Sequence, residues 1–145
     1  MNELTGTGVY LVQMPVSLPL VMVFASGRQV VLQPGVYYYA GSAQRGLKSR
    51  ITRHARREKP LRWHIDYLAS QYPANFCWIW QDAQKNFECE IARTLARKLV
   101  LIPGFGSSDC RCPGHLFCGS PQETAQLVST LNPDMSFALS EDTPL

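Results

Sequence analysis

The sequence predicts an α+β fold, with a small, mostly antiparallel sheet flanked by three or four helices. Over residues 6–41, segments rich in β-branched and aromatic residues follow one another with short turns between them, as strands of a meander do. Several later segments instead place apolar residues four positions apart, which is typical of amphipathic helices. A chain of 145 residues, 46% of them hydrophobic, has the size and composition of one domain with its own core.

The first part of the chain is expected to form antiparallel strands. The segment GTGVYLVQM, residues 6–14, is predicted to be the first strand, and LPLVMVFAS the second, with SGRQ as the turn after it. QVVLQPGVYYYAGS then predicts a short extended piece, a Pro-Gly turn and a further strand that ends at Gly41.

A helix is expected next, from Ser42 or the neighbourhood of Gly46 to about Lys59, where Pro60 ends it because proline cannot continue a helix. Its apolar stripe recurs every four residues: Leu47, Ile51 and Ala55.

The rest of the chain is expected to alternate helices with one strand. The predicted elements are a short helix over 61–72, a strand over 75–81, a helix over 87–101 and a last helix over 120–132. Ser120 followed by Glu123 is a capping-box pattern that indicates the start of the last helix. A Cys/His-containing loop occupies 104–118, and the region 120–145 holds the last helix and an acidic tail. No linker divides the chain, so we predict one domain over 1–145.

Positive charge is unevenly distributed. The net charge is +3, yet residues 45–62 hold 8 of the 14 Lys and Arg residues against one acid, Glu58. This asymmetry indicates either a polyanionic partner or a solvated helix face. The N-terminus lacks the pattern of a signal peptide, and the apolar runs are too short for a membrane span, so we expect a cytoplasmic protein without membrane contact.

Two short motifs precede the cationic segment: Gly8-Val9-Tyr10 on the first strand and Tyr39-Ala40-Gly41 on the strand that ends at Gly41. Their order, followed by an arginine-bearing helix, resembles the GIY-YIG nuclease superfamily, with Val9 and Ala40 in place of isoleucines. The longer blocks WHIDYL, ECEIA and GFGSSDCRCPGHLF resemble its Uri-type branch. The likeness spans roughly residues 6–118.

The resemblance implies a catalytic set. Tyr10 and Tyr39 would lie on neighbouring central strands, Tyr10 orienting or deprotonating water and Tyr39 supporting it by hydrogen bonding. Arg50 would clamp a phosphate with its planar fork. His54, one helical turn later, would act as a general base or donate to a phosphate. His64 is a secondary catalytic candidate, because a histidine beside apolar residues is more often a core group.

The resemblance also implies a divalent metal. Glu88 is the expected ligand, since an unpaired carboxylate on the inward face of a helix needs a partner, and Glu90 is the second choice. Mg²⁺ or Mn²⁺ suits a site with few protein ligands. A structural Zn²⁺ at the Cys/His loop is the weaker expectation, because four ligands in nine residues are closer than zinc sites usually allow; packing is the expected role, with His115 an additional site residue. The four are Cys110, Cys112, His115 and Cys118.

The leading hypothesis is therefore a metal-dependent endonuclease that hydrolyses phosphodiester bonds in nucleic acid, DNA rather than RNA. Lys48, Arg53 and Arg57 would add contacts to phosphates that give affinity without reading sequence. A catalytically inactive nucleic-acid-binding module of the same fold is the alternative. A protein–protein adaptor that uses the Cys-rich loop and the acidic tail is a third. The oligomeric state is left open by the sequence.

Overall fold

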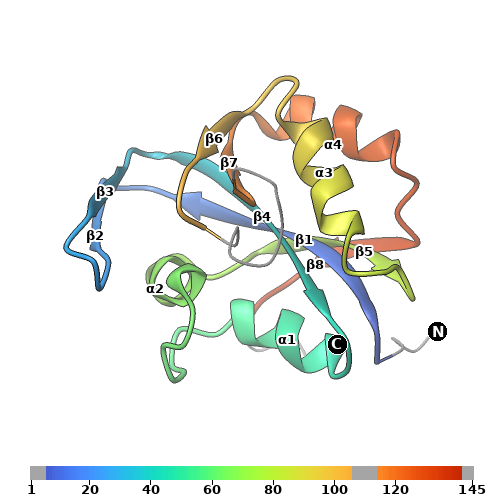
Figure 1. Cartoon of the computed structure of the whole chain (residues 1–145), viewed down its shortest axis with the longest axis horizontal. Helices are drawn as coiled ribbons and strands as arrows, with labels where there is room; N and C mark the ends of the chain where they lie inside the picture. The colour runs from blue at the N-terminus through green and yellow to red at the C-terminus, as the bar shows by residue number, and fades with distance from the viewer. Residues whose placement is uncertain (1–5, 106–113, 142–145) are drawn as a thin grey trace.

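The computed structural model describes residues 6–105 and 114–141, and their fold is α+β, as the sequence predicts. A six-stranded sheet has the strand order β6-β7-β4-β1-β5-β8, with every neighbouring pair antiparallel. Strands β2 and β3 form a separate two-stranded hairpin that projects from one end of the molecule (Figure 1).

The strands are β1 (Gly8–Val16), β2 (Leu20–Val23), β3 (Gln29–Leu32), β4 (Gly35–Ala43), β5 (Phe76–Gln81), β6 (Val100–Ile102), β7 (Leu116–Cys118) and β8 (Met135–Ala138). The helices are α1 (Leu47–His54), α2 (His64–Gln71), α3 (Phe87–Leu95) and α4 (Pro121–Ser129).

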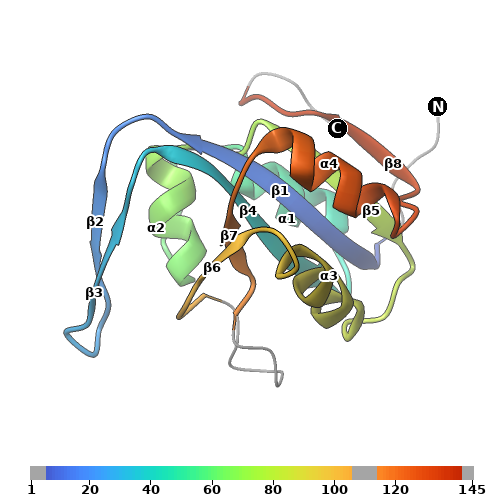
Figure 2. The same cartoon turned by 90° about the horizontal axis from the view of Figure 1, so that it is seen from above.

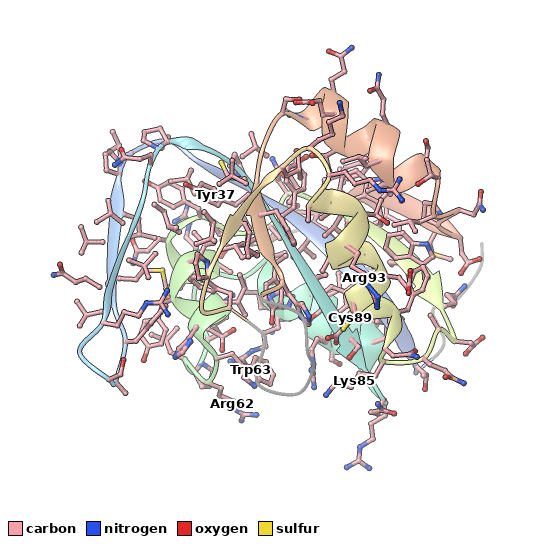
Figure 3. The ribbon with its side chains drawn as sticks, turned by 45° about the horizontal axis from the view of Figure 1, so that its top comes forward. Tyr37, Arg62, Trp63, Lys85, Cys89 and Arg93 are labelled. Atoms are coloured by element: carbon pink, nitrogen blue, oxygen red, sulfur yellow. The ribbon has the colours of Figure 1, made fainter. Side chains whose placement is uncertain are left out.

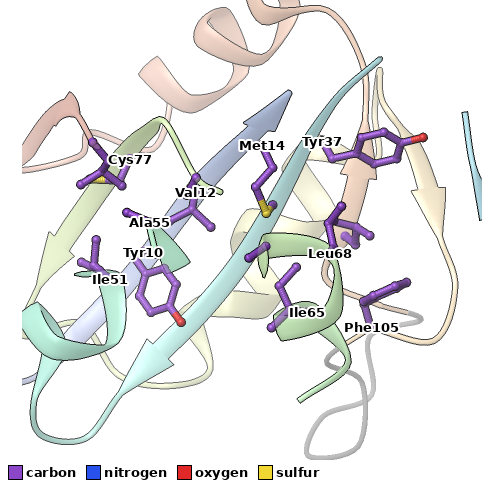
Figure 4. Packing of buried hydrophobic residues seen from close by; sticks show 14 of the residues in the cluster. Tyr10, Val12, Met14, Tyr37, Ile51, Ala55, Ile65, Leu68, Cys77 and Phe105 are labelled. Atoms are coloured by element: carbon purple, nitrogen blue, oxygen red, sulfur yellow. The ribbon is translucent and has the colours of Figure 1, made fainter. Parts of the chain in front are cut away.

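Helices cover both faces of the sheet: α1 and α2 lie on one face, and α3 and α4 on the other (Figures 1 and 2). Successive side chains of a strand point to opposite faces, so β1 supplies both cores. Tyr10, Val12 and Met14 belong to the core under α1 and α2, part of which Figure 4 shows. Val9 and Leu11 belong to the core under α3 and α4.

Helix α1 ends at His54, five residues before the predicted end at Lys59. Two carbonyls of its last turn accept hydrogen bonds from groups outside the helix. The backbone amide of Ala74 donates to the His54 carbonyl at 2.9 Å, and Nζ of Lys59 donates to the Arg53 carbonyl at 2.8 Å. These bonds replace the continuation of the helix that the sequence pattern favoured.

Helix α3 is also shorter than predicted, because Val100–Ile102 leaves the helical path and pairs with β7 as strand β6. Strand β8 was not predicted at all; it pairs with β5 along one edge of the sheet. The cap of α4 is confirmed, since Oγ of Ser120 accepts a hydrogen bond from the Glu123 amide at 3.1 Å. In the part of the chain that the structure describes, no helix has the length and apolar character needed to cross a membrane.

Candidate active site

Tyr10 and Tyr39 lie on the two central strands, β1 and β4, which are direct neighbours. Tyr10 is paired across the strands with Gly41, and its phenol ring rests on the backbone of that glycine. A Cβ added to Gly41 would lie 2.5 Å from Oη and 2.6 Å from Cζ of Tyr10. Because real Cβ contacts are not this short, only glycine permits the close approach.

The glycine of the first motif also has a packing reason. A Cβ on Gly8 would lie 2.7 Å from the carbonyl oxygen of Trp80 on β5 and 3.0 Å from Cδ2 of Leu47 on α1. Gly8 therefore lets α1 pack closely against the sheet. Because α1 carries both Arg50 and His54, this contact positions two of the expected site residues.

His54 brings an imidazole into contact with the first tyrosine. Its Nε2 lies 2.7 Å from Oη of Tyr10, and both side chains are buried. The Tyr39 ring is edge-on to the same imidazole, with ring centroids 5.9 Å apart. Among the described residues, Nδ1 of His54 has no hydrogen-bond partner. A buried polar atom without a hydrogen-bond partner is unusual in a folded protein.

Burial keeps this cluster uncharged. It raises the pKa of Tyr10 well above its ordinary value; Tyr39 adds to the effect, and Arg50 opposes it. Burial also raises the pKa of Tyr39, with Glu88 adding to the rise and Arg50 opposing it. The pKa of His54 falls to about 3, first because it is buried and second because Lys59 lies near it. At neutral pH the two phenols and the imidazole are therefore all neutral.

Arg50 reaches the same cluster from α1. Its partner on the sheet is Ser42, near the end of β4. Strand β7 pairs with β4 only over Tyr37–Tyr39 and so does not reach Ser42. The Ser42 carbonyl accepts a hydrogen bond from Nη1 of Arg50 at 3.0 Å. The guanidinium lowers the pKa of both Tyr10 and Tyr39, which places its positive charge near both phenols.

Glu88 approaches from α3, on the opposite side of the sheet from α1. Its side chain is buried, and its charge raises the pKa of both phenols. Oε2 lies 3.3 Å from Nδ1 of His115, so the buried carboxylate has an imidazole beside it. The partner that a buried carboxylate needs is therefore present without a metal, so the burial of Glu88 alone does not require one.

The family described as "domain of unknown function DUF123" matches residues 9–136. The chain belongs to this DUF123 family. No curated protein and no solved structure matches the chain.

The DUF123 match contains every residue of the expected catalytic and metal sets. The structure brings Tyr10, Tyr39 and His54 into contact, and Arg50 lies one helical turn before His54 and donates to the Ser42 carbonyl of β4. Glu88 lies on α3, across the sheet, and its charge raises the pKa of both phenols.

Two other expected residues of the DUF123 domain lie elsewhere. His64 is stacked on Phe24, with ring centroids 4.1 Å apart and planes inclined by 13°, and its Nδ1 lies 3.1 Å from the Gly104 carbonyl oxygen. It thus joins α2 to the residue that follows β2. Glu90 is exposed and lies 3.5 Å from Arg93, so it forms a surface ion pair.

The three expected phosphate contacts differ in their surroundings. Arg53 forms an ion pair of 2.8 Å with Asp66, and its side chain is only 17% exposed. Arg57 is exposed and donates from Nη1 to the Gln71 carbonyl at 2.8 Å. Lys48 is exposed on α1. Arg53 therefore stabilises the fold, and Lys48 and Arg57 are the more accessible cations.

The Cys/His loop is described only in part. Cys110 and Cys112 lie outside the described residues. Cys118 is a free thiol packed with the core under α1 and α2, and His115 lies beside Glu88 on α3. Residues three positions apart on an extended chain point to opposite sides, which disfavours a shared zinc ion. Within residues 6–105 and 114–141, no three His, Cys, Asp or Glu side chains are grouped to hold a metal.

Gly41→Ala is expected to push the Tyr10 ring off β4 and weaken its hydrogen bond to His54. Overpacking of this kind lowers the free energy of unfolding by roughly 1–3 kcal/mol, which urea unfolding measures. Gly6→Ala is the matched control, because the nearest atoms to an added Cβ there are 3.9 Å away. Equal losses in the two variants would contradict the close approach of Tyr10 to Gly41.

Stability should depend on pH through His54. Its folded pKa of about 3 lies below the unfolded value of 6.5, so the unfolded state binds more protons between these values. The free energy of unfolding therefore falls as pH falls through this window, by about 3 kcal/mol at pH 4 from this group. His54→Gln should reduce the loss between pH 7 and pH 4 by about that amount, measured by urea unfolding at both pH values.

His64→Gln, which removes an exposed imidazole stacked on Phe24, is the matched control for this measurement. An unchanged pH dependence in His54→Gln would show that His54 is not held neutral by burial.

Proposed function

We propose that this chain is a divalent-metal-dependent nuclease that hydrolyses phosphodiester bonds in DNA, and that it belongs to the Uri-type branch of the GIY-YIG superfamily. One observation carries the proposal: Oη of Tyr10 lies 2.7 Å from Nε2 of His54, and the Tyr39 ring is edge-on to the same imidazole. Arg50, one turn earlier on the same helix, is held by the Ser42 carbonyl of β4, and the charge of Glu88 raises the pKa of both phenols. A cation, an anion and two phenols are groups that phosphodiester hydrolysis can use.

Arg50 is assigned to the scissile phosphate. Arg50 is only partly buried, so part of its guanidinium is accessible to a ligand. The hydrogen bond from Nη1 to the Ser42 carbonyl fixes the orientation of the guanidinium. A guanidinium can hold two phosphate oxygens at once, and it stabilises the charge that develops on them. Tyr39, whose ring is partly buried on the adjacent strand, is assigned to orient the attacking water by hydrogen bonding.

Tyr10 and His54 are assigned to proton transfer. Both are neutral in the free protein, and their polar atoms are 2.7 Å apart. Tyr10 Oη accepts a proton from the attacking water, while the hydroxyl proton of Tyr10 passes to Nε2 of His54. The new bond joins the water oxygen to phosphorus, the bond from phosphorus to the leaving sugar oxygen breaks, and that oxygen takes a proton from a solvent water. A phosphate bound nearby would stabilise the imidazolium that this transfer forms.

The residues around Glu88 fit Mg²⁺ or Mn²⁺. Mg²⁺ usually keeps several waters and binds through one or two carboxylates together with substrate phosphates, so a single protein carboxylate is sufficient. Glu88 would hold the ion, with the imidazole of His115 beside its carboxylate to orient it. When bound, the ion would offset negative charge on the phosphate oxygens.

The proposal predicts Mg²⁺-dependent cleavage of labelled DNA oligonucleotides, measured by gel electrophoresis over time. Tyr10→Phe and Glu88→Gln should each lower the cleavage rate by roughly 10²–10⁴-fold, because each removes a group that acts in the reaction. Arg50→Ala should act in the same direction, and EDTA should stop cleavage.

Two variants control for non-specific damage. Tyr38→Phe alters the neighbouring tyrosine on β4, which faces the core under α3 and α4, and Glu90→Gln alters the exposed glutamate of the same helix as Glu88. Both should cleave like the parent. Parental rates in Tyr10→Phe and Glu88→Gln would refute the assigned roles, and DNA binding without cleavage by the parent would favour the inactive binding module.

A further inference from the structure

An exposed tryptophan lies beside the candidate active site and has no role in the proposed hydrolysis. Trp63 is 39% exposed, although it immediately precedes α2 and is firmly fixed there. Its backbone amide donates to Oδ2 of Asp66 at 2.9 Å, and its carbonyl accepts from the Asp66 amide at 2.9 Å. The backbone of Trp63 is therefore held in place, while a large part of the residue faces solvent.

Asp66 is itself held strongly. Burial acts to raise its pKa, but hydrogen bonds from Arg53 and from the amides of Trp63 and Arg62 outweigh burial and lower the pKa. The carboxylate is charged at neutral pH, and it fixes both the start of α2 and the backbone of Trp63. An aromatic side chain with few rotatable bonds on such a fixed backbone loses little conformational entropy when a ligand stacks on it.

Two cations of α1 lie against the indole. The guanidinium carbon of Arg50 is 4.8 Å from the ring centroid of Trp63, and that of Arg53 is 5.1 Å away. These arginines are three positions apart on α1 and so approach from the same side of that helix. The same guanidinium of Arg50 also donates to the Ser42 carbonyl. Because Arg50 is the residue proposed to hold the phosphate, Trp63 lies next to the proposed phosphate position.

The surroundings of Trp63 combine positive charge with further exposed apolar area. Leu61 is 45% exposed, and Tyr67, one helical turn after Trp63, is 47% exposed. Arg62 lies next to Trp63 and extends outward at the same end of the molecule (Figure 3). Exposed rings among arginines complement a ligand that carries both flat apolar rings and negative charge.

We propose that Trp63 is a stacking platform for an unpaired base next to the phosphate that Arg50 holds, and that the substrate is single-stranded DNA or a single-stranded segment of DNA. In a duplex the faces of the bases are covered by their neighbours, so only an unstacked base can lie on the indole. The identity of the bond that is cleaved rests on the proposed function; the stacking does not, because it concerns binding.

The test is a binding measurement without metal. Fluorescence anisotropy in EDTA gives the affinity for a labelled short oligothymidylate, for an abasic strand of the same length and charge, and for the duplex. Stacking of one base contributes about 1–3 kcal/mol, so the parent should bind the oligothymidylate roughly 5- to 150-fold more tightly than the abasic strand. It should also bind the single strand more tightly than the duplex.

Trp63→Ala should remove the preference for the base-containing strand and leave affinity for the abasic strand nearly unchanged. Trp63→Phe should keep part of the preference, since a smaller ring still stacks, and it also serves where the alanine variant fails to fold. Val100→Ala is the matched control, because Val100 is 65% exposed on β6 and far in sequence from Trp63.

Equal binding of the base-containing and abasic strands by the parent would overturn the platform, as would an unchanged preference in Trp63→Ala. Tighter binding of the duplex would overturn the single-stranded substrate. Tighter binding of oligouridylate RNA than of the DNA strand would overturn the assignment to DNA. Base-dependent binding without Mg²⁺-dependent cleavage would refute the nuclease alone, and cleavage without base-dependent binding would refute the platform alone.

Discussion

The approach of the Tyr10 ring to the backbone of Gly41 is the constraint on which the site depends. It presses a phenol flat against the neighbouring strand, at a place where any side chain on Gly41 would collide with it. The ring is then directed toward α1, where Oη of Tyr10 and Nε2 of His54 are hydrogen-bonded at 2.7 Å. Gly8 has the complementary effect, since it lets Leu47 and the rest of α1 come close to the sheet. Two glycines thus set the distance between the sheet and the helix that carries the cations.

Burial and charge act against each other within this cluster. Desolvation keeps both phenols protonated and His54 unprotonated, and Arg50 only partly opposes the effect on the phenols. The free protein is therefore expected to hold both phenols and the imidazole in neutral form. In the proposed reaction, the charges of a phosphate and of a metal would then act on these neutral groups. Arg53 has a different role: its ion pair with Asp66 fixes the start of α2, and so the position of Trp63.

Local pattern predicted the strands that carry Tyr10 and Tyr39, the start of α1 and the cap of α4, because each is decided by neighbours in sequence. The local pattern failed where contacts with residues distant in sequence determine whether an element forms or where it ends. Helix α1 ends early since Ala74 takes a carbonyl of its last turn, and β8 exists because β5 offers an open edge. Similarly, the spacing of Arg50 and His54, one helical turn apart, indicated that both lie on one side of α1. The imidazole beside Glu88 and the stacking of His64 on Phe24 depend instead on tertiary packing. Trp63 was missed, although a tryptophan among arginines was the signal available.

The central claim is that the carboxylate of Glu88 and the two phenols surround one metal-binding position. Paramagnetic broadening of NMR signals by Mn²⁺ tests it most directly, because the effect falls steeply with distance and does not require catalysis. Substoichiometric Mn²⁺ should selectively broaden the signals of Tyr10, Tyr39 and Gly41, and Glu88→Gln should abolish this selectivity. Broadening that is uniform over the surface, or that persists unchanged in Glu88→Gln, would contradict the account.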